Sequence, residues 1–227
     1  MFDNKEYFMF DLYGTLVDIK TDETLPYLWS SLASFYSLNG AAYSDADIQR
    51  EYKLLCGKNR GDEVEIDLTK VFKCLYENRN VKPSKQLISD TAIMMRSVST
   101  VRLRLFDGAA EVLTKLRERG KKVYLFSNAQ ACFTVPELKS LGLYDLFDGI
   151  CISSDLKVKK PSPAFYRKAL AGKDPGRCVM IGNDEFADIE GAMTAGMEAC
   201  YIQTEQSPTI PRQLPSVQID NLWEILY

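Results

Sequence analysis

Apolar and polar positions divide this chain into a short buried strand, a helical block and a long alternating series. The first strand is the run Tyr7-Phe8-Met9-Phe10, which ends at Asp11 and a turn containing Gly14. A run this apolar is typical of a central parallel strand that is covered on both faces. Ligands of such sheets bind beyond the carboxyl ends of the strands, so we expect Asp11 to point into a crevice. The alternative is that Asp11 and Gly14 only form a turn.

From about residue 21 to residue 100, apolar residues recur at the spacing of amphipathic helices, which predicts one small bundle. Ser44 and Asp47 resemble a capping box, and Pro83-Ser84 suits a helix entry. The predicted helices cover Leu25–Tyr36, the segment after Ser44, Glu63–Glu77 and the segment after Pro83-Ser84. The aromatic residues that we expect in the bundle core, rather than against a substrate, are Tyr27, Trp29, Tyr36 and Tyr52.

Beyond Phe106 the pattern alternates between helix and strand. Asp107 is expected to cap the first of these helices, and Gly120 to end it. Repeated strand and helix units predict a parallel sheet with right-handed crossovers. The predicted strands are Lys122–Phe126, Ile150–Ser153, Cys178–Ile181 and one near Tyr201, and the predicted helices run through Leu138, after Pro163 and through Met193.

The predicted fold class is therefore α/β: a Rossmann-like, three-layer core with a parallel sheet and an inserted α-helical bundle. We expect residues 1–18 and 101–227 to form the core domain, and residues 19–100 to form the inserted domain. The stretch Ser207–Pro215 is rich in proline and is expected to be an extended surface segment, followed by a short helix over Asp220–Leu226.

Composition narrows the possible partners. The chain has 227 residues with 28 Lys and Arg against 31 Asp and Glu, a formal charge of −3, and no block of basic residues, so we expect no nucleic-acid partner. No apolar run approaches the ~20 residues needed to cross a bilayer, and nothing near Met1 resembles a signal peptide. We therefore expect no membrane partner and a cytoplasmic protein.

Histidine and cysteine usage excludes several kinds of chemistry. The chain has no histidine, which excludes histidine-dependent triads, histidine metal ligands and an imidazole base. Its six cysteines are widely spaced and lack a Cys-x-x-Cys pair, so zinc and dithiol chemistry are not expected, and most cysteines are expected to be small core residues in a reducing cytosol. Any catalytic chemistry must therefore use carboxylates, hydroxyls and lysines.

Such residues follow the ends of the later predicted strands. Ser127 comes directly after an apolar strand, Lys160 precedes Pro161 at a helix entry, and Asp184 and Asp188 are four apart, so they would share a helix face. Gathered carboxylates repel one another unless a cation joins them, and hard oxygen ligands favour Mg²⁺. The alternatives are a serine in a turn, a solvated lysine and acids that only stabilise a helix N-terminus.

In chain order these residues resemble the four motifs of the haloacid dehalogenase superfamily, beginning with Asp11-Leu12-Tyr13-Gly14-Thr15. The resemblance covers most of the chain and implies a small helical cap that excludes water from the site. It implies that Asp11 is the nucleophile and that Tyr13 and Lys160 complete the catalytic set. The implied phosphate-binding residues are Thr15, Ser127, Asn128 and Lys160, and the implied Mg²⁺ site consists of Asp11, Tyr13, Asp184 and Asp188.

Tyr13 makes the reaction ambiguous. Phosphatases of this superfamily usually carry aspartate there, which protonates the leaving alcohol and later activates water, whereas tyrosine at this position resembles the metal-free 2-haloacid dehalogenases. A phenol with a pKa near ~10 is a poor acid or base around neutrality. A departing halide needs no proton, so dehalogenation would tolerate Tyr13.

Charge favours the phosphatase. Asp11, Asp184 and Asp188 outnumber Lys160 by two charges, which would repel a phosphate or a haloacid unless Mg²⁺ is bound. We rank first a Mg²⁺-dependent phosphatase that acts on a small phosphorylated metabolite through an aspartyl-phosphate intermediate. The alternatives are a metal-free haloacid dehalogenase and a phosphometabolite-binding protein with negligible turnover. A role of Asn183 in metal binding, and the choice between monomer and homodimer, stay open.

Overall fold

The core of the protein is a six-stranded parallel sheet. A computed structural model describes residues 1–57, 65–208 and 217–227. The strands lie in the order β5-β4-β1-β6-β7-β8, and every neighbouring pair is parallel. Their bounds are β1 (Tyr7–Phe10), β4 (Lys122–Ser127), β5 (Gly149–Ile152), β6 (Cys178–Gly182), β7 (Glu198–Ile202) and β8 (Val217–Ile219).

Both faces of the sheet are covered, as the apolar run of β1 predicts. Successive strand residues point to opposite faces. Phe8 and Phe10 pack in one core cluster with α5 (Ala109–Glu118), whereas Met9 packs in another with α8 (Pro163–Leu170). The three-layer α/β core is therefore confirmed.

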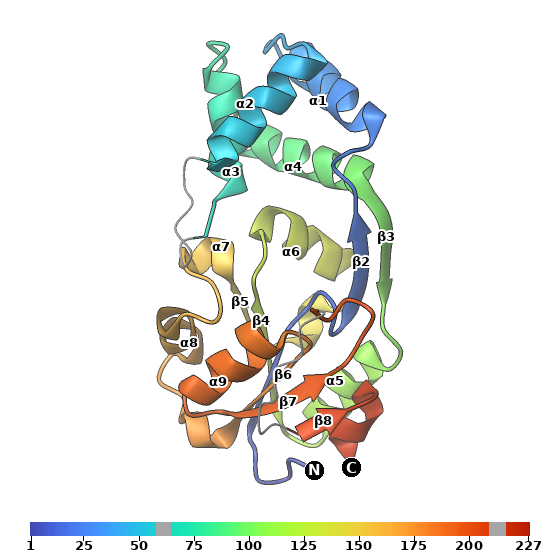
Figure 1. The fold of residues 1–227 in the computed structure, drawn as a ribbon, viewed down its shortest axis with the longest axis vertical. Coiled ribbons are helices and arrows are strands. Elements are labelled where there is room, and N and C mark those ends of the chain that lie inside the picture. The colour runs from blue at the N-terminus through green and yellow to red at the C-terminus, as the bar shows by residue number, and fades with distance from the viewer. Residues whose placement is uncertain (58–64, 209–216) are drawn as a thin grey trace.

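Four helices form the predicted bundle at one end of the molecule (Figure 1): α1 (Pro26–Leu38), α2 (Asp45–Gly57), α3 (Leu68–Glu77) and α4 (Lys85–Ser99). They share their own apolar core, in which the rings of Tyr36 and Tyr76 stack with centroids 4.1 Å apart. Trp29 and Tyr52 are buried there as expected, but Tyr27 is 56% exposed, so its assignment to the core is wrong. Helix α6 (Ala131–Ser140) lies between this bundle and the sheet.

The bundle is connected to the core by two antiparallel strands, β2 (Val17–Thr21) and β3 (Thr100–Leu105). This ribbon, whose strands flank the predicted helical block, was not predicted. Both segments alternate apolar and polar residues, but over only five and six residues, which is a weak signal beside four helices.

Several helix ends differ from the prediction. Ser44 and Ser84 do cap α2 and α4, accepting hydrogen bonds from the amides of Asp47 (3.2 Å) and Leu87 (3.0 Å). Asp107 does not cap α5: the cap is Gly108 at φ 77°, and the Asp107 carboxylate accepts a hydrogen bond from the Trp223 indole at 3.1 Å. Helix α3 begins at Leu68, and the start predicted at residues 63 and 64 lies outside the described residues.

Further differences from the prediction lie towards the end of the chain. The strand predicted to reach Ser153 ends one residue earlier, because Ser153 begins a helix. Residues 209–216 of the predicted extended tail lie outside the described residues, and β8 after them was not predicted. The terminal helix begins at Leu222 rather than Asp220. The elements not yet given are α7 (Ser153–Leu156), a π-helix (Glu185–Glu190), α9 (Gly191–Thr194) and 3₁₀ turns at Tyr144–Leu146, Pro175–Arg177 and Leu222–Leu226.

The cysteines and helix lengths agree in part with expectation. All six cysteines are free; Cys178 and Cys200 are fully buried, and Cys56, Cys132 and Cys151 are partly buried against the apolar clusters. In the described ranges, no helix is both long and apolar enough to span a membrane.

Candidate active site

Asp11 lies at the carboxyl edge of the sheet, where the sequence predicts it. Its amide donates to the Ile181 carbonyl at 2.9 Å, which extends the pairing of β1 and β6 by one residue. Its side chain is only slightly exposed and lines a cavity of about 190 Å³. The loop then turns at Gly14 with φ 89°, where a Cβ would lie 2.3 Å from the Asn183 amide, so glycine is required both for the backbone angle and for the space.

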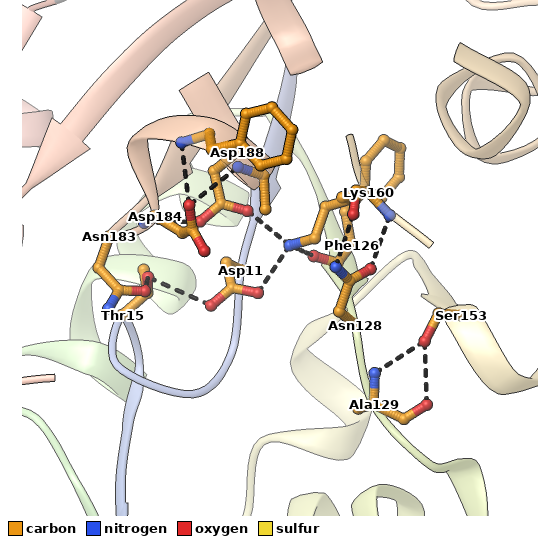
Figure 2. Close-up of polar contacts among 12 residues, drawn as sticks. Asp11, Thr15, Phe126, Asn128, Ala129, Ser153, Lys160, Asn183, Asp184 and Asp188 are labelled. Carbon is orange, nitrogen blue, oxygen red and sulfur yellow. Dashed lines mark hydrogen bonds and ion pairs between the residues drawn. The ribbon is translucent and has the colours of Figure 1, made fainter. Parts of the chain in front are cut away.

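Lys160 is at the centre of the polar network (Figure 2). Its buried ammonium donates to Asp11 Oδ1 at 2.7 Å, to Asp188 Oδ1 at 2.6 Å and to the Phe126 carbonyl at 2.7 Å. Burial lowers the pKa of Lys160, but the charges of Asp11 and Asp188 outweigh burial and the net pKa is raised. Lys160 therefore remains protonated and orients the Asp11 carboxylate through one oxygen.

Ser127 is the last residue of β4 and Asn128 is the next residue, but the two side chains differ in their partners. Asn128 accepts from the Lys160 amide at 2.7 Å and donates to the Lys160 carbonyl at 2.9 Å, so its side chain fixes the lysine loop. The Ser127 side chain is buried, and its hydroxyl lacks a hydrogen-bond partner among the described residues. A buried hydroxyl without a partner is costly, and a bound ligand could satisfy it.

Thr15 supports the nucleophile rather than the cavity wall. Its buried hydroxyl lies 3.5 Å from Asp11 Oδ2 and 3.3 Å from Asn183 Oδ1. Oδ2 of Asp11 thus has a long and weak contact, in contrast to the short ion pair made by Oδ1. Of the two Asp11 oxygens, Oδ2 is the one more available to a ligand.

The two acids after β6 have different environments. Asp184 caps the π-helix, because its Oδ1 accepts from the amides of Phe186 and Ala187, both at 2.9 Å. Asp188 is inside that helix and fully buried, with Lys160 on one oxygen and the Asp184 amide on the other at 3.1 Å. Burial raises the pKa of Asp188, and its ion pair with Lys160 opposes this only in part. The expected regular α-helical face shared by the two acids is replaced by a cap and a buried ion pair.

The oxygen donors fit a hard divalent cation in type. Asp11 and Asp184 both line the cavity with Asn183, and Figure 2 shows their carboxylates on the same side of Lys160. Asp11 and Asp188 share the Lys160 ammonium, and Asp184 adds a third carboxylate to the same cavity, so the site has an excess of negative charge. As the side chains lie, however, no group of three or more acids or cysteines in the described part of the chain is arranged to hold a metal. Asp188 in particular is committed to Lys160.

The hydroxyl of Tyr13 points towards α6. It donates to Glu137 and lies 2.9 Å from the Thr134 hydroxyl, while Arg96 of α4 pairs with the other oxygen of Glu137. Burial, together with the negative charge of Glu137, raises the pKa of Tyr13 well above its ordinary value of 10. The phenol therefore stays neutral, and its proton is held in the hydrogen bond to Glu137. A group in this state is poorly suited to act as the acid or base of a catalytic cycle.

Sequence reasoning missed several neighbours of the site. Gln206 and Pro208, from the loop after β7, line the cavity, and Thr204 donates to the Gly14 carbonyl at 2.8 Å. Glu137 and Arg96 were also missed. None of these belongs to a motif, and each approaches the site only through the tertiary fold.

Comparison with known proteins identifies the family. A family model described as haloacid dehalogenase-like hydrolase matches residues 6–196, which is most of the chain. The chain belongs to this family. The Asp11, Ser127, Lys160 and Asp184 positions of this hydrolase all lie within the matched range, and the recognition made from the sequence motifs is confirmed.

Relatives of this haloacid dehalogenase-like hydrolase include two named phosphatases. It is 29% identical over 126 residues to a phosphoserine phosphatase of Thermus thermophilus, covering 55% of this chain and 51% of the relative. It is 31% identical over 121 residues to a glyceraldehyde 3-phosphate phosphatase of Methanothermobacter thermautotrophicus, covering 52% and 54%. The aligned part of the chain thus spans about half the length of the curated relatives it matches.

A solved structure agrees over nearly the whole fold. The 2-haloacid dehalogenase from Pseudomonas syringae pv. Tomato DC3000 superposes with a TM-score of 0.67 at 20% identity, covering 98% of this chain and 96% of that one. At this identity the likeness concerns the fold alone, including a helical bundle beside a Rossmann-like core. The choice between phosphatase and dehalogenase therefore depends on the site itself.

Proposed function

We propose that this hydrolase is a magnesium-dependent phosphatase that acts on a small phosphorylated metabolite, with Asp11 as the nucleophile. The observation that carries the proposal is the charge of the cavity. Lys160 is already neutralised by Asp11 and Asp188, while Asp184 adds a further carboxylate to the same cavity. An anionic substrate needs a divalent cation there, which supports phosphate chemistry over a metal-free haloacid site. The phosphatase names of the two sequence relatives agree.

The geometry supports a specific attacking atom. Lys160 holds Asp11 Oδ1, so Oδ2 attacks the phosphorus in line. The Oδ2–P bond forms as the bond from phosphorus to the leaving oxygen breaks, giving an aspartyl phosphate. Water then attacks this intermediate, which restores the carboxylate and releases inorganic phosphate.

The remaining phosphoryl oxygens have partners among the chain's own residues. The unpartnered Ser127 hydroxyl would donate to one of them, and the charge of Lys160 stabilises the anion. Asn128 contributes by fixing the loop that presents Lys160. Magnesium would be held by Asp11, Asp184 and the Tyr13 carbonyl, with Asp188 acting through Lys160, and when bound it neutralises the excess charge and stabilises developing negative charge.

The leaving group is the part of the reaction with the least support from the protein. Tyr13 does not supply a proton, because its hydroxyl is bonded to Glu137. We therefore expect turnover to favour substrates whose leaving oxygen is a weak base. A Tyr13→Asp variant places a carboxyl group two residues after the nucleophile, and a higher rate in that variant would show that protonation of the leaving group limits the native enzyme.

The test is hydrolysis of an aryl phosphate with Mg²⁺ and with chelator, for the native protein and for Asp11→Asn. Magnesium-dependent phosphate release is expected, with a loss of about 10³-fold or more in Asp11→Asn and unchanged folding. Substantial metal-dependent activity left in Asp11→Asn would overturn the assignment. Halide release from a 2-haloacid in chelator would indicate the dehalogenase, and tight vanadate binding without turnover would indicate a binding protein.

The organisation around this site is proposed on the same basis. We assign residues 1–18 and 101–227 to the catalytic core and residues 19–100 to a cap, with the boundary inside the ribbon of β2 and β3. The six free cysteines support a reducing, cytoplasmic location. A small phosphorylated molecule is the proposed partner, and neither a membrane nor a nucleic acid is part of the proposal.

A further inference from the structure

The bundle and the core meet through a buried charge pair that also reaches the nucleophile loop. Arg96, near the end of α4, forms an ion pair with Glu137 of α6. Glu137 in turn accepts a hydrogen bond from the Tyr13 hydroxyl. The guanidinium also lies 5.8 Å from the centre of the Tyr13 ring and 5.0 Å from that of Phe133. One arginine of the bundle thus contacts a chain of groups that ends two residues from Asp11.

Burial makes this pair sensitive to docking of the bundle. The Glu137 side chain is 7% exposed and that of Arg96 is 20% exposed. If the bundle moved away from α6, Glu137 would keep its negative charge in a buried site without its cation, which is unfavourable. The hydroxyl of Tyr13 would then be bonded to an uncompensated carboxylate.

We propose that Arg96 and Glu137 are positioning residues that couple docking of the bundle to the conformation of the loop that follows Asp11. With the pair formed, Glu137 and Thr134 hold the Tyr13 hydroxyl on α6 and so fix the loop from Leu12 to Val17. Because such coupling is reciprocal, an ordered nucleophile loop also favours the docked bundle. The coupling itself does not depend on the reaction, whereas its effect on turnover rests on the proposed function.

A second junction between bundle and core supplies a matched control. Lys157, after α7, pairs with Asp67 at the start of α3 at 2.8 Å. This pair also joins the bundle to the core, but its lysine is half exposed and neither partner contacts Tyr13 or Glu137 in the described residues. Lys157→Gln should therefore weaken docking of the bundle without affecting the Tyr13 loop. Only changes to Arg96 or Glu137 should also remove the coupling to that loop.

The test is hydrogen exchange followed by mass spectrometry on the full chain, comparing the native protein with Arg96→Gln and Lys157→Gln. Amides of residues 12–17 should exchange at least threefold faster in Arg96→Gln and be unchanged in Lys157→Gln. The double variant Arg96→Gln with Glu137→Gln has no uncompensated charge, so its exchange should return towards the native rate. If Arg96→Gln does not fold, Arg96→Lys takes its place in the hydrogen-exchange comparison with the native protein.

Two outcomes would overturn the coupling: residues 12–17 exchange equally in Arg96→Gln and the native protein, or Lys157→Gln accelerates them as much. If an aryl phosphate is hydrolysed, kcat should fall at least fivefold in Arg96→Gln, while Lys157→Gln should change KM alone. A native protein without phosphatase activity would end the proposed function and leave the exchange result to decide the coupling.

Discussion

The ammonium of Lys160 lies 2.7 Å from Oδ1 of Asp11, and both side chains are buried. This contact joins residues that are 149 positions apart in the sequence. It determines which oxygen of the proposed nucleophile is free, because the ammonium holds Oδ1 through a short ion pair. The same ammonium compensates Asp188, so one lysine balances two buried acids.

Removing the Lys160 charge should therefore affect both stability and activity. In Lys160→Gln, Asp11 and Asp188 lose their counterion, and we expect the free energy of unfolding to fall by about 3 to 5 kcal/mol. Urea unfolding followed by circular dichroism measures this loss. Lys159→Gln is the control, because it removes a positive charge one residue away and keeps the pair. Equal stability of the two variants would contradict a structural role for Lys160.

The hydroxyl of Tyr13 should be dispensable for proton transfer. Tyr13→Phe loses the bonds to Glu137 and Thr134, so unfolding should become easier by about 1 kcal/mol. The rate of aryl phosphate hydrolysis should fall less than about tenfold, against the 10² to 10⁴ expected for loss of a general acid. The dependence of kcat on pH should keep its shape. A lost limb in that profile would show that the phenol does act as an acid or base.

The predicted site residues that lie together in the structure follow local sequence patterns. Asp11 directly follows β1, Ser127 is the last residue of β4, Asp184 comes two residues after β6, and Lys160 precedes a proline at a helix entry. The carboxyl ends of parallel strands meet at one edge of the sheet, so a local pattern was enough to place these side chains together.

The direction of Tyr13 could not be predicted in this way. Its partners Thr134 and Glu137 lie 121 and 124 residues away, in a helix without any motif, and Arg96 comes from the bundle. The same reason explains Asp107, whose local capping role was displaced by a contact with Trp223, 116 residues away. At such positions tertiary contacts override the local conformational propensity of the sequence.

The ribbon that connects the bundle to the core should weaken in acid. Asp18 is buried between Arg102 and Arg104, each at 2.8 Å. Burial raises the pKa of Asp18, but the hydrogen bonds from Arg104 and Arg102 and their charges outweigh it, so the net pKa is lowered. A carboxylate with a lowered pKa stabilises the fold above its unfolded pKa of about 3.9, and this stabilisation is lost as the pH falls through the folded value.

Asp18→Asn should accordingly be less stable than the native protein at pH 7, by about 1 kcal/mol, with the difference shrinking below about pH 4. Thermal unfolding of both proteins from pH 7 to pH 3 measures it. Asp22→Asn is the comparison, since Asp22 directly follows β2 but its side chain bonds only to Thr24 in the described contacts. A difference between native protein and Asp18→Asn that stays constant with pH would show that the ion pairs do not cause it.

Two buried serines at neighbouring strand ends should respond oppositely to loss of their hydroxyls. Ser127 has no hydrogen-bond partner in the described structure, whereas the Ser153 hydroxyl is bonded to Glu65 and to the carbonyl and amide of Ala129. Ser153→Ala leaves those groups unsatisfied and should destabilise the fold by about 1 to 3 kcal/mol. Ser127→Ala removes an unsatisfied group, so stability should stay within about 0.5 kcal/mol of the native protein or rise.

Ligand binding should depend on Ser127 and not on Ser153, the reverse of their effects on stability. The reason is that the Ser127 hydroxyl is the group that a phosphoryl oxygen would satisfy. Inhibition by vanadate in the presence of Mg²⁺ should weaken about tenfold in Ser127→Ala, the loss of one charge-assisted hydrogen bond. In Ser153→Ala the inhibition constant should be unchanged at a temperature where the variant is folded. Vanadate inhibition unaffected in Ser127→Ala would mean that the unpartnered hydroxyl does not face the phosphoryl group, and phosphate binding by this strand end would have to rest on its backbone amides.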